Sequence, residues 1–317
     1  MEQTDHPRAW KVLLAFSIIY FVWGSTFLAI RVGVQHVPPF LFAALRFIVA
    51  GAALFGWMRA TGAPNPSARE WRSVSLLALL IFVCDYGLLF WAEKRVPSGI
   101  AAVMLATIPA FMALAEISIL RTQRLTPRLG FAMLIGVTGV MVLVSRTVSF
   151  GDAPIDPMGA CALIMAAVSW AISSALSKKL QLPSSKAISS GAQMLAGGLM
   201  LLVVSAAFGE LRGFQIQAVP CRIWLALLYL IVAGSIIGFT AYVWLIHHES
   251  PTRVGTYAYV NPVVAVLIGY FLGGEALGAR TLLGTALVLI SVVVITTTKK
   301  AQSRAPSAQP IKAIEET

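Results

Sequence analysis

The chain has 317 residues, of which 58% are hydrophobic and only 12% are charged. An average soluble domain carries about 25% charged residues, so this composition excludes an ordinary water-soluble protein. The net charge of +11 could indicate a nucleic-acid partner. The basic residues, however, stand in short clusters between apolar segments, where they set membrane topology. We therefore expect a lipid bilayer as the surrounding medium and no nucleic-acid partner.

Ten apolar segments of roughly 20 residues follow one another along the chain, the length that a helix needs to cross a bilayer. They lack the period-two alternation of strands, so we expect helices that satisfy their own backbone hydrogen bonds. The first segment exceeds the apolar core of a signal peptide, about 7–15 residues, and should be retained. The predicted spans are 12–30, 40–58, 73–92, 98–120, 128–144, 158–177, 187–208, 223–246, 254–272 and 281–297.

The two halves of the chain repeat one pattern, with five spans in each. Because five is odd, the second half must enter the membrane from the side opposite the first. Inverted repeats of this kind build two alternating access states around a midplane site in many secondary transporters. The matching elements are Trp23 before Arg31 and Trp170 before Lys178, and Pro109 before Gln123 and Pro262 before Glu275.

The distribution of Lys and Arg predicts the orientation. With a cytoplasmic N-terminus, 16 of the 24 basic side chains fall inside the cell and seven outside, and Arg46 lies within a span. Basic residues accumulate on the cytoplasmic side, so we expect a multi-pass protein of the plasma (inner) membrane with both termini in the cytoplasm. Its expected parts are a cytoplasmic N-terminus at 1–11, a first repeat at 12–145, a linker loop at 146–157, a second repeat at 158–297 and a disordered cytoplasmic tail at 298–317.

Several motifs resemble the repeats of a known family. Trp-Gly-Ser-Thr-Phe at 23–27 and Ala-Ala-Leu-Arg-Phe at 43–47 resemble the start of an EamA-type repeat. Tyr-Ala-Tyr-Val-Asn-Pro-Val-Val-Ala at 257–265, with Gly274 and Glu275 behind it, resembles the end of the second repeat. On these motifs the chain resembles the drug/metabolite transporter superfamily over nearly its whole apolar length, and most of all its YedA-like exporters.

The resemblance implies an all-helical integral membrane fold of ten transmembrane helices, arranged as two inverted five-helix EamA repeats around a central cavity. It also implies export of small metabolites or drugs. One departure is Gln123, which stands where the family's first half usually has an acidic residue after the fourth span. If a charge at both symmetric positions serves gating or coupling, the first half has lost it. Arg31, where many relatives have lysine, is a milder change.

Residues at mid-depth are predicted to line the substrate cavity. The two tryptophans and two prolines of the matching elements each lie roughly eight to twelve residues from a span end, near the membrane midplane. Tryptophan normally prefers the interfaces, so this placement indicates either a cavity wall or tight helix packing. Each proline removes a backbone hydrogen bond, and we hypothesise that the kinks shape the cavity and hinge its gates. The candidates are Trp23, Pro109, Trp170, Tyr259, Asn261 and Pro262.

Charges inside a membrane are costly and usually functional. Arg46 and Asp85 each lie about seven residues below the outer ends of consecutive spans, so an ion pair between them is expected. Either this pair only locks the outer halves together, or Asp85 faces the cavity and binds an amine or a proton. Glu116, about four residues from the cytoplasmic end of its span, either snorkels toward water or takes part in coupling.

Two polar residues are predicted at the gates. Glu275 falls just past the ninth span and is expected to cap or gate the outer mouth. Gln193 sits near the inverted counterpart of Arg46, where it either hydrogen-bonds a substrate or joins helices. No metal site, cofactor or catalytic residue is expected, because the sequence contains no CxxC, HExxH or GxSxG pattern and no GxxxxGKS phosphate loop.

A secondary transporter of small molecules explains this pattern best, with a proton or solute gradient, or facilitated diffusion, as its energy source. The main alternative is a nucleotide-sugar or sugar-phosphate exchanger of the same superfamily. Such a site needs several buried Lys or Arg for phosphate, and only Arg46 is deep. A neutral, zwitterionic or cationic substrate such as an amino acid or a drug fits better. A channel or a membrane structural protein would not require the inverted duplication.

Overall fold

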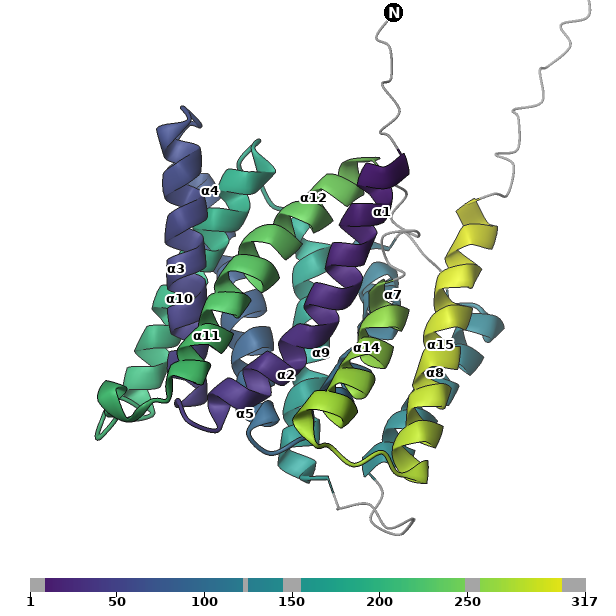
Figure 1. Cartoon of the computed structure of the whole chain (residues 1–317). Coiled ribbons are helices and arrows are strands. Elements are labelled where there is room, and N and C mark those ends of the chain that lie inside the picture. The colour runs from purple at the N-terminus through teal and green to yellow at the C-terminus, as the bar shows by residue number, and fades with distance from the viewer. Residues whose placement is uncertain (1–8, 122–124, 145–154, 249–256, 304–317) are drawn as a thin grey trace, which may run out of the picture.

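The computed structural model of the protein describes residues 9–121, 125–144, 155–248 and 257–303, and every regular element in these ranges is a helix (Figure 1). The side chains at 144, 243, 246–248, 259 and 296–303 also lie outside the description. Gln123, most of the predicted linker loop, the start of the ninth predicted span and the greater part of both predicted tails therefore lie outside the described residues.

Both described ends of the chain lie at the same end of the helix bundle. The first residue of α1 (Ala9–Ser17) and the last of α15 (Ala279–Ser303) are both at the top of Figure 1. We call this end the termini face and the other end the opposite face. The second helix pair of the chain, α3 (Pro39–Ala60) and α4 (Ala68–Ala78), connects at the termini face, since two spans return the chain to its starting side.

The helices are long and apolar enough to cross a membrane, which confirms the expected all-helical integral membrane fold. Seven stretches reach the length of a full span: Ala9–Val34, Pro39–Ala60, Ala68–Glu93, Ser98–Leu120, Pro157–Ser177, Lys186–Ala207 and Cys221–Tyr242. Three shorter apolar helices cover Pro127–Leu143, Val260–Gly273 and Ala279–Ile295, where the fifth, ninth and tenth spans were predicted. The third span begins with α4 at Ala68, five residues before its predicted start at Ser73, because Ser67 and Glu70 form a capping box there.

Four of the spans are interrupted, and most of the interruptions are wide π-helical turns. The first span is α1, η1 (Ile18–Val22) and α2 (Trp23–Val34); the third is α4, η2 (Leu79–Gly87) and α5 (Leu88–Glu93); the fourth is α6 (Ser98–Leu105), α7 (Ile108–Ala115) and η3 (Glu116–Leu120); the eighth is α11 (Cys221–Tyr229), η5 (Leu230–Ile237) and α12 (Gly238–His248). Such turns often occur at functional sites. The longest two, η2 and η5, fall in the third helix of each repeat.

Equivalent helices of the two repeats pack against each other. The closest pairs are α3 with α10 (Lys186–Ala207), and α8 (Pro127–Val144) with α15. Glycines let the α3 and α10 backbones touch: a Cβ on Gly51 would lie 2.3 Å from the backbone nitrogen of Leu195, and one on Gly191 would lie 2.7 Å from that of Phe55. Small residues at such crossings are typical of membrane helices.

The first helices of the two repeats run in opposite directions. In the first repeat, α2 descends from Trp23 to Arg31 at the opposite face. In the second, α9 (Pro157–Ser177) starts near the opposite face, where its N-cap Asp156 lies 3.6 Å from Arg95, and ends at Lys178 on the termini face. Each of these helices contacts the third helix of the other repeat, α2 with α11 and η5, and α9 with η2. The remaining helix, α14 (Tyr257–Gly273), packs on α2 and α6.

Candidate functional site

A cavity of about 870 Å³ lies between the two repeats. Its wall reaches the exposed residues Ser184 and Lys186, in and after the loop between α9 and α10, so it opens at the termini face. At its other end the lining stops at the buried side chains of Ile30, Arg46 and Leu89. A volume within roughly 300–1,000 Å³ is typical of sites for small molecules. The arrangement is therefore a deep pocket with one described mouth.

Most of the residues predicted for the site line this one cavity. The lining includes Trp23, Arg46, Asp85, Pro109, Glu116, Trp170, Gln193, Asn261 and Pro262. The side chain of Tyr259 lies outside the described residues, and Glu275 lies at the opposite face, away from the cavity wall. The structure thus brings together residues that are up to 239 positions apart in the sequence, from Trp23 to Pro262.

Trp23 is held against the third helix of the second repeat. Its Nε1 donates a hydrogen bond to the carbonyl oxygen of Gly234 in η5, at 3.1 Å. Its ring centroid lies 5.2 Å from that of Tyr242 and 5.4 Å from that of Tyr257, and the second contact is edge-on. Both tyrosines also line the cavity. The indole is therefore a fixed wall element, since aromatic contacts and a satisfied N–H hold it in place.

Trp170 occupies the corresponding place in the second repeat. Its ring meets that of Tyr86 in η2 edge-on, with 6.3 Å between the centroids. One residue earlier on α9, Ser169 donates through Oγ to the carbonyl oxygen of Leu80 in η2, at 2.8 Å. The first helix of each repeat therefore bonds a carbonyl in the π-helical segment of the other. In both repeats the bonded carbonyl oxygen belongs to a π-helical segment, η5 for Trp23 and η2 for Ser169.

The two prolines differ in their effect on the helices. Before Pro109 the fourth span is broken, because α6 ends at Leu105 and α7 begins at Ile108; Thr107 Oγ1 bonds Met104 O at 2.6 Å in this break. Pro262 instead lies inside α14, which continues past it to Gly273. The sequence predicted equivalent kinks at Pro109 and Pro262. The structure breaks the helix only at Pro109.

Asn261 joins α14 to the wide turn of the first span. With the amide oriented so that its nitrogen faces the acceptors around it, this nitrogen donates to the carbonyl oxygens of Ile19 and Tyr20 in η1, both at 3.2 Å. The residue is buried and also borders the cavity. The polar partners that a buried amide needs are thus backbone carbonyl oxygens of the π-helical segment η1.

Arg46 does not form the expected ion pair with Asp85. Its Nε donates to Ser235 Oγ at 3.0 Å, and its guanidinium lies 4.9 Å from the ring of Phe47 and 5.5 Å from that of Tyr86. No contact of 4 Å or less joins the two charged groups among the described ion pairs. Position along a helix fixes depth but not the direction around the helix axis. Tyr86, the neighbour of Asp85 on η2, is the residue that faces Arg46.

Each of these two charged residues keeps one polar atom without a partner. Both are 3% exposed, and within the described part of the chain Arg46 Nη1 and Asp85 Oδ1 have no hydrogen-bond partner. Both residues line the cavity. Burial of an unpaired charge is costly, so a ligand that supplies an acceptor to Arg46 and a donor to Asp85 would be stabilised here.

The remaining polar lining residues lie nearer the termini face. Gln193 donates through Nε2 to Ser189 Oγ one turn away on α10, at 3.0 Å, and it is part of the wall rather than of a constriction. Glu116 begins η3 and shares the mouth region with Lys178 and Lys186. The mouth therefore carries both signs of charge, whereas the deep end carries only Arg46 and Asp85.

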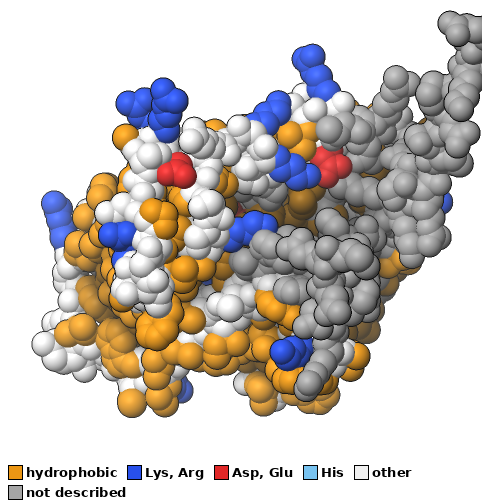
Figure 2. Space-filling model, turned by 90° about the horizontal axis from the view of Figure 1, so that it is seen from above, with side chains coloured by type: hydrophobic (Ala, Val, Ile, Leu, Met, Phe, Trp, Pro, Cys, Tyr) orange, Lys and Arg blue, Asp and Glu red, His pale blue; other side chains and the backbone are white. Residues whose placement is uncertain are grey.

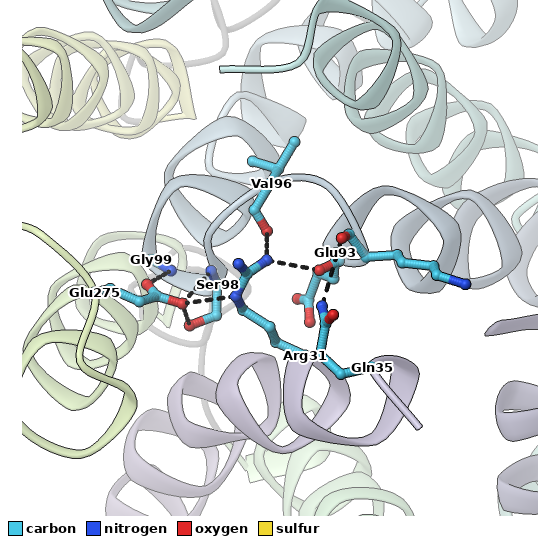
Figure 3. Close-up of polar contacts among 8 residues, drawn as sticks. Arg31, Gln35, Glu93, Val96, Ser98, Gly99 and Glu275 are labelled. Atoms are coloured by element: carbon cyan, nitrogen blue, oxygen red, sulfur yellow. Dashed lines mark hydrogen bonds and ion pairs between the residues drawn. The ribbon is translucent and has the colours of Figure 1, made fainter. Parts of the chain in front are cut away.

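The opposite face is closed by a cluster around Arg31 and Glu275, which we call the latch (Figure 3). Glu275 Oε1 accepts hydrogen bonds from the backbone N and the Oγ of Ser98, both at 2.7 Å, and Oε2 accepts one from the Gly99 backbone N at 3.1 Å. Arg31 Nε lies 3.4 Å from Glu275 Oε1. Its Nη1 donates to the carbonyl oxygens of Glu93 and Val96, at 2.8 and 2.6 Å.

The latch matches charges to helix ends. The Glu275 carboxylate caps the N-terminus of α6, where backbone N–H groups attract an anion, and Arg31 binds carbonyl oxygens at and after the C-terminus of α5. The loop from 93 to 98 and the segment after α14 are thereby tied to α2. The sequence predicted that Glu275 caps or gates the outer mouth. In the structure Glu275 caps the N-terminus of α6.

Two acidic residues at this face were missed by the sequence reasoning. Glu210 caps the N-terminus of α3, accepting from the backbone nitrogens of Phe40 at 3.4 Å and Leu41 at 2.9 Å. Like Glu275, it follows a glycine with positive φ, Gly209 at 73° and Gly274 at 64°. A Gly-Glu pair just after an apolar run was therefore a usable signal. Glu93 is fully buried, and its place in the Glu-Lys-Arg run 93–95 made it resemble a loop residue.

Comparisons with known proteins agree with this architecture. The EamA-like transporter family matches residues 10–145 and 157–297, which is one match for each repeat. The inner membrane transporter YedA of Escherichia coli K12 is 35% identical over 300 residues and covers 94% of both chains. A probable amino-acid metabolite efflux pump of Salmonella typhimurium LT2 is 27% identical over 297 residues, covering 87% of this chain and 92% of its own. A crystal structure with a TM-score of 0.62 and 23% identity covers 93% of this chain and 99% of its own, so the fold is shared.

Proposed function

Because the chain belongs to the EamA-like transporter family of the drug/metabolite transporter superfamily, we propose that it exports small amphipathic molecules by alternating access to the central cavity. The observation that carries this proposal is the cavity itself, which opens at one face and ends below a charged latch at the other. Alternating access requires a second state in which the latch is open and the termini face is closed. The two repeats supply equivalent helices for both states.

The termini face is the cytoplasmic one in this proposal. Figure 2 views this face and shows Lys and Arg side chains spread over it, with fewer acidic ones. The excess of basic residues on this side of the sequence gives the same orientation. The structure then represents an inward-open state. The three shorter apolar helices complete a set of ten spans, and the opposed directions of α2 and α9 make the repeats inverted.

The substrate that fits the deep end of the cavity is a zwitterion with an apolar body, such as an amino acid or a related metabolite. Arg46 Nη1 would receive its carboxylate and Asp85 Oδ1 its ammonium group, because both atoms are buried without partners. The aromatic walls around Trp23 and Trp170 would hold the apolar part. The description of the Salmonella relative as a probable amino-acid metabolite efflux pump agrees with this class.

The proposal is tested by counterflow in proteoliposomes. Liposomes loaded with an unlabelled amino acid should accumulate the same labelled compound, and Asp85→Asn and Arg46→Lys should each lower this uptake. Asp156→Asn is the matched control, because this carboxylate pairs with Arg95 at the opposite face and lies outside the cavity. Efflux of cationic drugs with no amino-acid exchange would contradict the substrate class. Exchange of sugar phosphates would favour the nucleotide-sugar type of exchanger, and failure of all three would contradict transport.

Orientation has an independent test in a native cysteine. Cys221 is exposed at the start of α11, on the opposite face. A membrane-impermeant maleimide should label it from outside intact cells, and Cys221→Ser should lose this labelling. Labelling that appears only after the cells are opened would reverse the proposed orientation.

A further inference from the structure

Glu93 is a buried acid for which the transport cycle proposed above has no role. Its side chain is 0% exposed, and neither carboxyl oxygen has a hydrogen-bond partner among the described residues. It ends α5, one turn after Leu89, which lines the closed end of the cavity. Residues four apart share one side of a helix. Glu93 therefore lies between the cavity and the latch.

Arg31 stands between two acids. Its Nε pairs with Glu275 at 3.4 Å, while its Nη1 already binds the backbone oxygen of Glu93 at 2.8 Å. In Figure 3 the Glu93 carboxyl lies on the side of Arg31 that faces away from Glu275. Arg31 can therefore leave Glu275 and pair with the Glu93 carboxyl through a change of side-chain conformation at Arg31 or Glu93.

Among the ionisable groups on the elements around α5, Arg31 is the cation already bonded to this residue, through the Glu93 backbone oxygen. From α3 comes Arg46, whose Nε is engaged with Ser235 and whose unpartnered Nη1 belongs to the deep end of the cavity, and from η2 come Asp85 and Tyr86 at the same end. Helix α6 carries no ionisable side chain. The start of α9 contributes Asp156, which is paired with Arg95 at 3.6 Å.

We propose that Glu93 is a proton-binding site that controls the latch. With its proton bound, the neutral carboxyl is tolerated without a partner, and Arg31 stays with Glu275. When the proton leaves to water, the carboxylate takes Arg31 from Glu275, and the bonds that hold the opposite face closed are lost. Only an O–H bond breaks and re-forms, and the proton is exchanged with solvent.

This inference rests on the proposed function, because it treats the opposite face as the outer gate of a transporter. A proton taken up at the open outer face would return Arg31 to Glu275 and close that face. Its release into the cavity at the termini face would then permit the next opening. The proton would in this way be the counter-ion of export, and the free energy of a pH gradient would drive the cycle.

The test measures the latch directly, without a substrate. Spin labels replace Lys94 and Ala276, two exposed residues at the opposite face, in a protein whose three native cysteines are substituted and that is held in lipid nanodiscs. Between about pH 5 and about pH 9, a range that covers perturbed carboxyl groups, the parental distance should shift from a short to a longer population. Glu93→Gln should stay short at both values. Asp156→Asn is the control and should respond as the parent does.

The outcomes separate this inference from the proposed function. A parental distance that is independent of pH, or a pH response in Glu93→Gln equal to that of the parent, would overturn the proton site. Should Glu93→Gln fail to fold, the parental comparison with Glu275→Gln still decides, since Glu275→Gln should give the longer distance at low pH as well. Counterflow by the parental protein is a separate measurement. Its absence would count against transport and leave the latch result standing.

Discussion

The two ends of the bundle use the same helices but are closed to different extents. At the opposite face, two acids of the second repeat, Glu275 and Glu210, cap α6 and α3 of the first repeat. At the termini face, Gly62 matches Gly209 with a φ of 92°, but Ala63 follows it where the second repeat has Glu210. Residues 121–124 likewise contain no acid where the second repeat has Glu275.

This difference shows that a symmetric scaffold need not have symmetric gates. The described contacts at the termini face include a hydrogen bond from Lys179 Nζ to the carbonyl oxygen of Ile119, at 2.7 Å, between the ends of α9 and η3. The neighbouring Lys178 lines the open mouth of the cavity. The acids that cap helices of the other repeat favour the closed opposite face, and the lack of an acid at the equivalent positions of the first repeat favours an open termini face. Four substitutions test this comparison.

Removing Arg31 should have the largest effect. Arg31→Ala takes the cation from Glu275 and leaves the Glu93 and Val96 carbonyls without their partner. Because the pair is partly exposed, we expect about 2 kcal/mol in favour of the open latch, roughly thirtyfold in the gate equilibrium. The Lys94–Ala276 spin-label distance would measure it. Arg31→Lys should retain part of the closed population, and an unchanged distance in Arg31→Ala would show that the latch is not a gate.

Neutralising Glu275 should have a smaller effect. Glu275→Gln keeps one acceptor oxygen for Ser98 but loses the charge that faces Arg31 and the start of α6. We expect about 1 kcal/mol of destabilisation of the closed latch, near fivefold in the gate equilibrium, since hydrogen bonds to charged groups are stronger than neutral ones. The same distance measurement applies, and raised salt should reproduce part of the shift in the parent. A larger effect than that of Arg31→Ala would place the main latch energy elsewhere.

The variant Glu210→Gln tests whether loss of a helix cap alone is enough to open the latch. Glu210 caps α3 as Glu275 caps α6, but it forms no ion pair in the described residues. We expect a loss of about 0.5–1 kcal/mol of stability, as for other helix caps, with no change in the latch distance. Thermal unfolding followed by intrinsic tryptophan fluorescence would measure the loss. An open latch in this variant would mean that both caps act as one unit.

Ala63→Glu should give the smallest shift and acts in the opposite direction. It places an acid at the termini face where the second repeat has Glu210, next to the end of α3 that packs on the start of α10. A favourable interaction with a helix N-terminus is worth about 0.3–1 kcal/mol. We expect slightly slower labelling of a cysteine placed at Ser184 in the mouth. Ala63→Gln is the uncharged control, and equal labelling in both variants would contradict a role for charge.

How far the sequence predicts this protein depends on the quantity in question. The helical character of the apolar segments and the two-repeat organisation follow from hydropathy and from the length that each helix needs to cross a bilayer. The cavity lining follows to a large extent too, because depth and polarity together select its residues. The Arg46–Asp85 pair failed, since equal depth does not place two side chains on facing sides of their helices.

The sequence by itself determined a duplicated membrane protein of the EamA-like transporter family, because lipid imposes length and apolarity on each helix separately. Only the tertiary structure decided which charges meet: Arg31 with Glu275, Glu210 with the start of α3, and a Glu93 carboxyl that has no hydrogen-bond partner among the described residues. The contacts of Glu275 and Glu210 join residues more than 160 positions apart across the two repeats. They depend on the rotation of each helix about its axis, which packing sets and hydropathy does not encode.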